Sequence, residues 1–267
     1  MSSLNHRLNR ENFNKYKKGD WDVYIFESCT STFDEAKNLI SEDTANGTMV
    51  ISETQTSGRG RQRRQWVSPK GGLWMSVIFK PKLNAAELAP VTVLCAAAAA
   101  KAIEELYPNI EPQIKWPNDI YIKGKKVCGI LAETVVKNSG IEYFIAGIGI
   151  NAKNAVKNKE EIKNISTSLK ENGAQVIIEQ LASLINDNLI GLIKEYEACR
   201  SLEFILDYYT KKMLWINEEA ELKNTITGKV SKSGTIKGIG EKGELLLAIE
   251  SGTEKIVSGE LSLRRKL

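Results

Sequence analysis

Hydrophobic residues recur along this chain with two different periods. Short runs that are apolar or that alternate with polar residues predict β-strands, at 21–27, 48–53, 72–80, 129–136 and 141–150. Longer stretches with apolar residues at helical spacing predict α-helices, at 85–106, 177–196 and 202–214. The pattern therefore predicts a mixed α+β domain, in which helices flank a sheet.

Local signals predict two further elements. Ser31 or Thr32 is followed three residues later by Asp34 or Glu35, which is a capping box and predicts a short helix that ends near residue 40. In the stretch IYIKGKKV, the pair at 123–124 predicts a hairpin with a two-residue turn.

The pattern changes at Asn217. From there the chain consists of short runs separated by glycine, such as GIGEKG, ELLLAIESG and EKIVSGELSLR. Many short strands with glycine-rich turns are typical of small barrels. We therefore expect two domains, a main domain at 1–216 and a β-barrel at 217–267.

Composition indicates a globular protein with a local basic feature. The 267 residues are 42% hydrophobic and 26% charged, which is enough to bury a core. The formal net charge is +4, and the stretch GRGRQRRQW (58–66) alone contains four arginines. The basicity that needs an explanation is therefore confined to this stretch.

Several functional classes are excluded or disfavoured. The most apolar stretch, 88–100, contains Pro90 and is too short to span a bilayer, and the N-terminus lacks the apolar core of a signal peptide, so we expect a cytoplasmic protein. The four cysteines are far apart, and His6 is the only histidine. A disulfide framework, a Cys/His metal site and a histidine-activated nucleophile are therefore not expected.

The arginine-rich stretch has the chemistry of an anion site. Gly58 and Gly60 allow the backbone to approach a ligand, and arginine offers a planar fork of donors that suits phosphate. A solvated basic loop and a nucleic-acid contact are the competing interpretations. Trp66 does not decide between them, because an indole stacks on adenine or on any base, or packs in a core.

A second polar cluster is KWPND (115–119), which lies between a predicted strand and the hairpin. Asn118 and Asp119 offer oxygens to a cation or a ribose, although the same residues also form ordinary turns. Lys126 and Gly129 follow in KKVCGILAE (125–133). The two G-x-G-x-x-G/A matches, at 147–152 and 238–243, are not followed by an apolar helix, so a dinucleotide fingerprint is not indicated.

Taken in order, these motifs resemble the catalytic core of biotin protein ligases. GRGRQRRQW is similar to that family's arginine loop, KWPNDIYI to its KWPND segment, KVCGILAE to its lysine-bearing strand and GIGIN (147–151) to the strand that ends in asparagine. Ser31-Thr32 matches an early Ser-Thr pair, and GELSLR (259–264) the closing segment. The resemblance extends from about residue 21 to the C-terminus.

The resemblance implies a fold and a reaction. The fold would be a class II synthetase-like catalytic domain with a small C-terminal SH3-like barrel. The enzyme would activate biotin with Mg-ATP to biotinyl-5'-AMP and then transfer biotin to a lysine of a biotin carboxyl carrier protein. An anion that attacks a polyanion needs cations in the site and does not need histidine, which agrees with the composition.

The resemblance also implies individual roles. The expected catalytic residues are Lys126, Arg59 and Arg61. Biotin is expected to contact Ser31, Thr32, Gln55, Gly58, Arg59, Arg61, Lys126, Gly129 and Leu131. ATP and the adenylate are expected to contact Arg61, Arg64, Trp66, Lys115, Asn118, Asp119, Asn151, Glu260 and Arg264, and Asn151 is also the candidate magnesium ligand.

Two features depart from the family pattern. Phe33 stands where other members carry a polar residue after Ser-Thr, and only about twenty polar residues precede the first predicted strand. A winged-helix repressor domain is therefore not expected, nor a DNA or membrane partner. The alternative functions are a lipoate or octanoate ligase, whose loop requires a histidine that this loop lacks, and a nucleic-acid-binding module. Both a monomer and a homodimer remain open.

Overall fold

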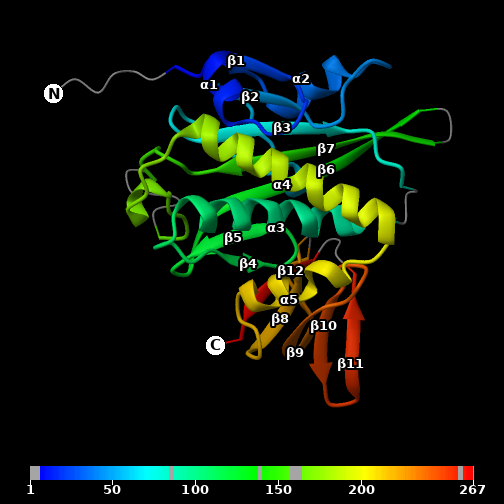
Figure 1. The fold of residues 1–267 in the computed structure, drawn as a ribbon. Helices are drawn as coiled ribbons and strands as arrows, with labels where there is room; N and C mark the ends of the chain where they lie inside the picture. The colour runs from blue at the N-terminus through cyan, green and yellow to red at the C-terminus, as the bar shows by residue number, and fades with distance from the viewer. Residues whose placement is uncertain are drawn as a thin grey trace.

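The computed structural model describes residues 7–83, 87–137, 140–156, 164–225, 227–257 and 261–266. Its main element is a seven-stranded sheet in the order β1-β2-β3-β7-β6-β5-β4, in which β1 and β2 are parallel and all other neighbours are antiparallel (Figure 1). The strands are β1 (Val23–Cys29), β2 (Thr48–Gln55), β3 (Leu73–Phe79), β4 (Gln113–Lys115), β5 (Asp119–Ile122), β6 (Lys125–Lys137) and β7 (Gly140–Ile150). The predicted mixed sheet is confirmed.

Five α-helices lie in the described part of the chain: α1 (Arg10–Tyr16), α2 (Thr32–Leu39), α3 (Ala89–Leu106), α4 (Ile178–Cys199) and α5 (Glu203–Lys212). The sequence-based prediction missed α1, because its RENFNKY sequence buries a single apolar residue, Phe13. The first residues of the helix predicted at 85–106 lie outside the described residues. None of the helices described is long and apolar enough to cross a membrane.

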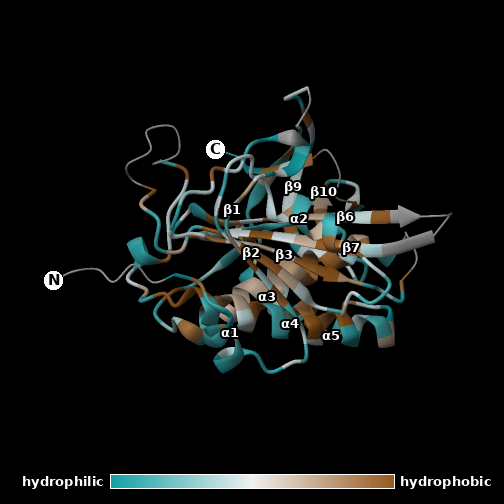
Figure 2. Cartoon of the chain, turned by 90° about the horizontal axis from the view of Figure 1, so that it is seen from above, coloured by the Kyte–Doolittle hydropathy of each residue, from teal (hydrophilic) through white to brown (hydrophobic). Residues whose placement is uncertain are grey.

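The two faces of the seven-stranded sheet have different partners. Helices α3 and α4 cover one face, on which the apolar side chains of the strands form the main core (Figures 1 and 2). Helix α2 packs on part of the other face, against β2, β3 and β7. Because side chains alternate along a strand, the sequence GIGI at 147–150 directs its isoleucines to the core and its glycines to the face that α2 shares.

The short helix predicted after residue 31 and the hairpin at 123–124 are confirmed, but the capping box is not. Ser31 is the N-cap residue of α2, and its Oγ accepts a hydrogen bond from Phe33 N rather than from the Asp34 amide that a capping box would use. The hairpin between β5 and β6 has positive φ at both Lys123 (49°) and Gly124 (74°), as a type I′ turn requires.

The C-terminal part forms a five-stranded antiparallel sheet in the order β11-β10-β9-β8-β12. Its strands are β8 (Glu219–Asn224), β9 (Val230–Ile239), β10 (Leu245–Ile249), β11 (Gly252–Ile256) and β12 (Leu261–Arg265). In the described residues β11 and β12 are the two edges and do not pair, so the predicted barrel is found here as an open sheet. The predicted change at Asn217 falls between α5 and β8.

The KWPND segment joins the two sheets. Trp116 Nε1 donates a hydrogen bond of 2.9 Å to Gly243 O of the C-terminal sheet's β9–β10 turn. Tyr209 of α5 donates through its hydroxyl to Pro117 O at 3.2 Å, and α5 itself packs on β9. The middle of the motif is therefore structural, and its flanking polar residues are free to face the other way.

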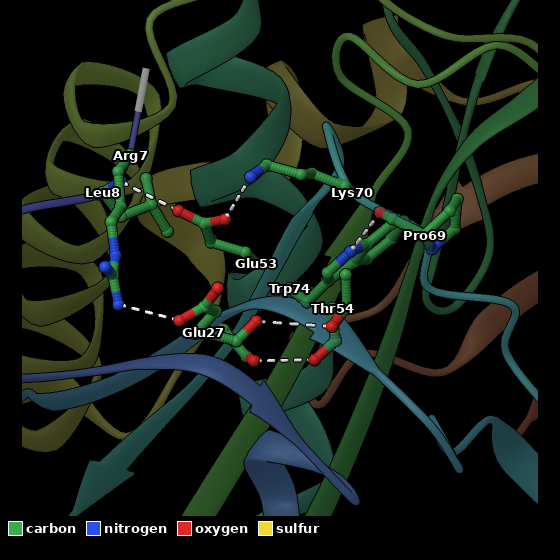
Figure 3. A network of polar contacts seen from close by, with 9 residues as sticks. Arg7, Leu8, Glu27, Glu53, Thr54, Pro69, Lys70 and Trp74 are labelled. Atoms are coloured by element: carbon green, nitrogen blue, oxygen red, sulfur yellow. Dashed lines mark hydrogen bonds and ion pairs between the residues drawn. The ribbon is translucent and has the colours of Figure 1, made fainter. Parts of the chain in front are cut away.

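A network of polar contacts fixes the segment that precedes α1 and the segment that follows the arginine-rich stretch (Figure 3). The carboxylate of Glu53, on β2, is only 7% exposed; it accepts from Leu8 N at 3.2 Å and pairs with Lys70 Nζ at 2.8 Å. The neighbouring ion pair between Glu27 and Arg7 is 70% and 72% exposed. The two carboxylates therefore differ chiefly in burial.

This difference predicts unequal contributions to stability. Replacing Glu53 by Ala leaves the Leu8 amide without its acceptor and should lower the free energy of unfolding by about 1–3 kcal/mol. Replacing Glu27 by Ala removes an exposed pair and should change it by less than about 1 kcal/mol. Urea denaturation of both variants measures the two values, and equal losses would contradict this account of the network.

Candidate active site

A cavity of about 250 Å³ opens on the face of the seven-stranded sheet that α2 partly covers. A second cavity, beside Trp116's partner turn at Gly243, has about 10 Å³, which is room for roughly one water molecule. The walls of the large cavity come from the start of α2, the arginine loop (58–66), the strands β3 to β7 and the edge strand β12. Residues far apart in the sequence therefore share one site.

Strand register builds the cavity floor. Lys115, Asp119, Gly129, Gly149 and Trp74 are successive partners across five neighbouring strands, from β4 through β5, β6 and β7 to β3. Directly opposite residues of a sheet project from the same face. The row therefore places two charged side chains at one end, a large aromatic ring at the other and no side chain between them.

The next row continues the floor toward α2. Leu131, Gly147 and Ser76 are register partners on β6, β7 and β3, and all three line the cavity. A Cβ on Gly147 would stand 3.4 Å from the Phe33 ring and 3.4 Å from Leu131 O. These are ordinary contact distances, so the position tolerates a methyl group. Together Gly129, Gly147 and Gly149 leave a strip of the cavity floor without side chains, which we call the groove.

A hydrogen-bonded cluster closes the α2 end of the groove. Gln55 Oε1 accepts from Thr32 N at 2.8 Å and from Thr32 Oγ1 at 3.1 Å. Thr32 Oγ1 also lies 2.9 Å from Ser76 Oγ. Ser31 and Thr32 are nearly inaccessible to solvent, at 1% and 3%. This end of the cavity is polar and neutral.

The arginine loop is a miniature hairpin over the groove. Trp66 N donates to Gly58 O at 2.8 Å, and Gly60 N donates to Arg64 O at 2.8 Å. Between these pairs the chain turns through a short 3₁₀ segment, Arg61–Arg63, with Gln62 at a left-handed φ of 58°. Gln62 Nε2 also donates to Thr225 Oγ1, so the tip of the loop contacts the C-terminal sheet.

The described arginine side chains of the loop each make an ion pair or a hydrogen bond. Arg59 pairs with Asp34 of α2 at 2.7 Å, Arg61 donates to Asn118 Oδ1 at 2.9 Å and Arg64 donates to Gln62 at 3.0 Å. Burial lowers the pKa of Arg61, an effect that the Asp119 carboxylate opposes and Arg64 reinforces. All three of these arginines line the cavity.

Trp66 and Lys126 lie above the two glycines of the floor. A Cβ on Gly149 would stand 2.7 Å from Trp66 Nε1, and one on Gly129 would stand 2.9 Å from Trp66 Cζ3. Lys126 Nζ is 5.1 Å from the centre of the Trp66 ring and 2.6 Å from Asp119 Oδ1. Trp66 Nε1 is buried and has no hydrogen-bond partner among the described residues.

Lys115 lines the cavity and has a lowered pKa. Burial lowers its pKa to about 8, and the charges of Arg264 and Lys126 act in the same direction, whereas Asp119 opposes them. Its Nζ lies 5.3 Å from the Tyr121 ring and 5.4 Å from the Trp215 ring. A negatively charged ligand would restore the favourable setting for its protonated form.

Most of the residues predicted from the sequence meet in this cavity. The lining contains Ser31, Thr32, Gln55, Arg59, Arg61, Arg64, Trp66, Lys115, Asn118, Asp119, Lys126, Gly129 and Leu131. Gly58, Asn151 and Arg264 do not line it, and Glu260 lies outside the described residues. Asn151 is 5% exposed and its Oδ1 accepts from Asn154 at 2.9 Å, so as it stands its amide oxygen is already engaged.

The sequence-based prediction missed several lining residues. Ser76, Gly147 and Gly149 reach the cavity through strand register, and Phe33 through the first turn of α2. The alternation of glycine with isoleucine in GIGI was a signal for the two glycines. The side chains that β12 contributes had no such signal, because their position depends on how the two sheets pack; they are Leu261, Ser262 and Leu263.

Comparison with known proteins first defines a broad class. Residues 24–151 match the Biotin/lipoate A/B protein ligase family, and residues 224–264 match the Biotin protein ligase C terminal domain. The first match contains the arginine loop, the KWPND segment and the glycine floor. The second contains most of β12, which lines the cavity.

Individual relatives narrow the class. The chain is 33% identical over 240 residues to the bifunctional ligase/repressor BirA of Bacillus subtilis (strain 168), covering 88% of this chain and 71% of that protein. It is 28% identical over 222 residues to the biotin–[acetyl-CoA-carboxylase] ligase of Paracoccus denitrificans, covering 79% and 88%. The biotin protein ligase of Aquifex aeolicus in complex with biotin and ATP superimposes with a TM-score of 0.79 at 31% identity, covering 92% and 99%. This chain therefore belongs to the biotin protein ligase family and is an enzyme.

The contact between the floor and Trp66 generates a prediction. In a Gly149→Ala variant the added methyl group would overlap the indole, so Trp66 should be displaced and its fluorescence shifted toward that of a solvent-exposed indole. Subtracting the emission of the same variant with Trp66→Phe isolates this signal. Gly191→Ala lies in the middle of α4, where the added methyl group would have no atom within 4 Å outside the local helix backbone. It is the matched control and should leave the spectrum unchanged. An unchanged spectrum for Gly149→Ala would contradict the contact.

Proposed function

We propose that this biotin–protein ligase activates biotin in the described cavity and transfers it to a carrier protein in two steps. A carboxylate oxygen of biotin attacks the α-phosphorus of ATP, which forms the mixed anhydride biotinyl-5'-AMP and releases pyrophosphate. The ε-amine of a carrier lysine then attacks the acyl carbon, AMP leaves and the amine releases a proton. The carrier is proposed to be the biotin carboxyl carrier protein of a biotin-dependent carboxylase.

One observation carries the proposal: Lys126 lies where the neutral groove meets the cationic end of the cavity. Its ammonium is next to the glycine floor on one side and to Asp119, in the row with Lys115, on the other. An acid that occupied the groove would bring its carboxylate to this ammonium, and a triphosphate would lie among the remaining cations. The two reacting anions would therefore meet at a shared positive charge, which lowers their mutual repulsion.

The α2 end of the cavity suits a neutral head group with a carbonyl. Gln55 uses one amide hydrogen on Ser68, which leaves the other for a ligand. The Ser31 hydroxyl accepts from Phe33 N and keeps its own hydrogen to donate. Together with Thr32 these groups are proposed to bind the ureido ring of biotin, while Gly129 and Leu131 border the groove for its aliphatic chain.

The opposite end suits ATP. Arg61, Arg64 and Lys115 are proposed to bind phosphates, with Arg264 near Lys115 as a further positive charge. Trp66 offers an aromatic face for the adenine or for the acyl chain. Arg59, held by Asp34, would keep the loop closed over the labile anhydride and exclude water.

Magnesium is proposed to enter as part of Mg-ATP. The described residues contain no group of three or more His, Cys, Asp or Glu side chains placed to hold a metal ion. An ion that arrives with ATP would be held mainly by the triphosphate. Asp119 is the acidic side chain of the described cavity lining and would be its protein ligand, in preference to Asn151. The ion would neutralise phosphate charge, while Lys126 and the arginines orient the two substrates.

The contacts of the arginine loop favour this proposal over a nucleic-acid-binding module. Arg61 lines the cavity and donates to Asn118 there, whereas an extended nucleic-acid contact would need the arginines on an open surface. ATP–pyrophosphate exchange with biotin, lipoate, octanoate or no acid tests the proposal directly. Exchange with biotin alone is expected, and exchange with lipoate or octanoate instead would overturn it.

Lys126 provides the sharpest test of the site. Lys126→Ala should lower kcat/KM for biotin-dependent exchange by about a hundredfold or more, because it removes the charge on which both anions converge. Lys125→Ala, the same substitution on the adjacent strand position outside the cavity lining, should stay within about twofold of the unaltered enzyme. Similar rates for the two variants would remove Lys126 from the mechanism.

The lowered pKa of Lys115 predicts a pH dependence. The amine loses its charge as pH rises through about 8, so kcat/KM for ATP in the exchange assay should fall with a midpoint near that pH. Lys115→Met should be slower at pH 7 and should lose this decline. The effect on stability has the opposite sign: between about pH 8 and 10.5 the unfolded chain binds the proton that the folded chain has lost, so the free energy of unfolding rises with pH in this range. If Lys115→Met showed the same fall in kcat/KM for ATP with rising pH, the fall could not be assigned to Lys115.

A further inference from the structure

Ser68 connects the α2 end of the cavity to the arginine loop. It lies two residues after Trp66, is only 4% exposed and pairs with Gln55 through an isolated antiparallel bridge, with Gln55 N donating to Ser68 O at 3.1 Å. Ser68 does not line the cavity and belongs to none of the sequence motifs described above. Its hydroxyl nevertheless occupies a defined position between two groups of the site.

The orientation of the Gln55 amide is determined by its neighbours. Thr32 N is a backbone donor and lies 2.8 Å from one terminal atom of Gln55, so that atom must be the oxygen. The amide nitrogen then faces Ser68 Oγ at 2.7 Å and donates to it. The group that would bind the acid's head and the serine are therefore joined by a bond of fixed direction.

Ser68 also forms a hydrogen bond with the end of the arginine loop. Its single hydroxyl hydrogen is free to donate, because the oxygen is the acceptor for Gln55, and it donates to Trp66 O at 3.0 Å. Trp66 N in turn closes the loop hairpin on Gly58 O. The chain of hydrogen bonds from Gln55 through Ser68 to Trp66 thus runs from the head-group end to the closing end of the arginine loop.

Gly58 provides independent support, because the space around these three groups leaves no room for a side chain. A Cβ at this position would stand 2.4 Å from Trp66 O, 2.6 Å from Ser68 Oγ and 3.0 Å from Gln55 Nε2. All three nearest atoms belong to the same chain of hydrogen bonds. The first glycine of the arginine loop is therefore needed for this connection rather than for lining the cavity.

We propose that Ser68 is a positioning residue that couples binding of the acid's head group to closure of the arginine loop. When a ligand fixes the Gln55 amide, Ser68 and the Trp66 carbonyl are fixed with it, and the loop is held over the cavity. The proposal rests on the proposed function, because the ligand used to test it is biotin. Ser68 itself does not touch the substrate.

The loop contains its own probe, because its arginines are trypsin sites. With the purified full chain, we would measure the rate of trypsin cleavage within residues 59–64 without biotin and at saturating biotin, and the biotin KM in pyrophosphate exchange. In the unaltered enzyme saturating biotin should slow cleavage. In Ser68→Ala saturating biotin should slow cleavage far less. Cleavage at saturation should then be about three- to tenfold faster than in the unaltered enzyme, a factor that corresponds to the loss of one typical hydrogen bond.

Two serine-to-alanine variants are matched controls. Ser76→Ala loses a contact to Thr32 at the head-group end but none to the loop, so it should raise the biotin KM while saturating biotin still protects the loop fully. Ser57→Ala alters an exposed side chain next to Gly58 and should change neither quantity. Ser68→Cys, with nearly the same volume and a poorer hydrogen-bonding group, should change protection in the same direction as Ser68→Ala even where the alanine variant folds badly.

The outcomes separate this proposal from the proposed function. Full protection of Ser68→Ala or Ser68→Cys at saturating biotin would overturn the coupling, as would an unaltered enzyme that exchanges with biotin but gains no protection. Loss of biotin-dependent exchange in the unaltered enzyme would instead overturn the proposed function. Reduced protection in the Ser68 variants alone, with Ser76→Ala fully protected, is the result we expect.

Discussion

The site depends on the absence of side chains from one strip of a sheet. Gly129, Gly147 and Gly149 occupy the centre of the cavity floor, and the isoleucines that alternate with the last two are buried in the main core on the opposite face. The same strands therefore supply hydrophobic packing on one side and an open groove on the other. Every other element of the site is placed relative to this groove: cations at one end, a neutral polar cluster at the other and an indole above it.

The KWPND segment links this groove to the rest of the molecule. Trp116 and Pro117 hold the C-terminal sheet through hydrogen bonds with Gly243 and Tyr209. The residues on either side of them face the cavity, including Lys115 at the end of the floor. One short motif therefore positions the C-terminal sheet and part of the cationic end of the cavity together, which explains why β12 forms a wall of the cavity although it lies more than a hundred residues away in the sequence.

Sequence patterns anticipated the parts of the site that are local. The arginine loop and the Ser31 cap were recognised from short stretches, because residue type and spacing suggest an anion site and a helix start, whereas the role expected for Lys126 came from the family resemblance. Ser68 and Ser76 could not be found in this way, because an ordinary serine gains its role only when strand register brings it to Gln55 or Thr32. The closed barrel predicted for the C-terminal part appears among the described strands as an open sheet, since glycine-separated short strands indicate antiparallel pairing but not whether the edges meet.

The central claim is that one cavity holds biotin and ATP together and retains the anhydride they form. It is tested most directly by incubating the full chain with biotin and α-³²P-labelled ATP, removing free nucleotide by gel filtration and counting the label that stays with the protein. The account predicts close to one biotinyl-AMP per chain, dependent on biotin and discharged by an acceptor carrier protein. Label that is absent, or that is retained equally without biotin, would contradict it.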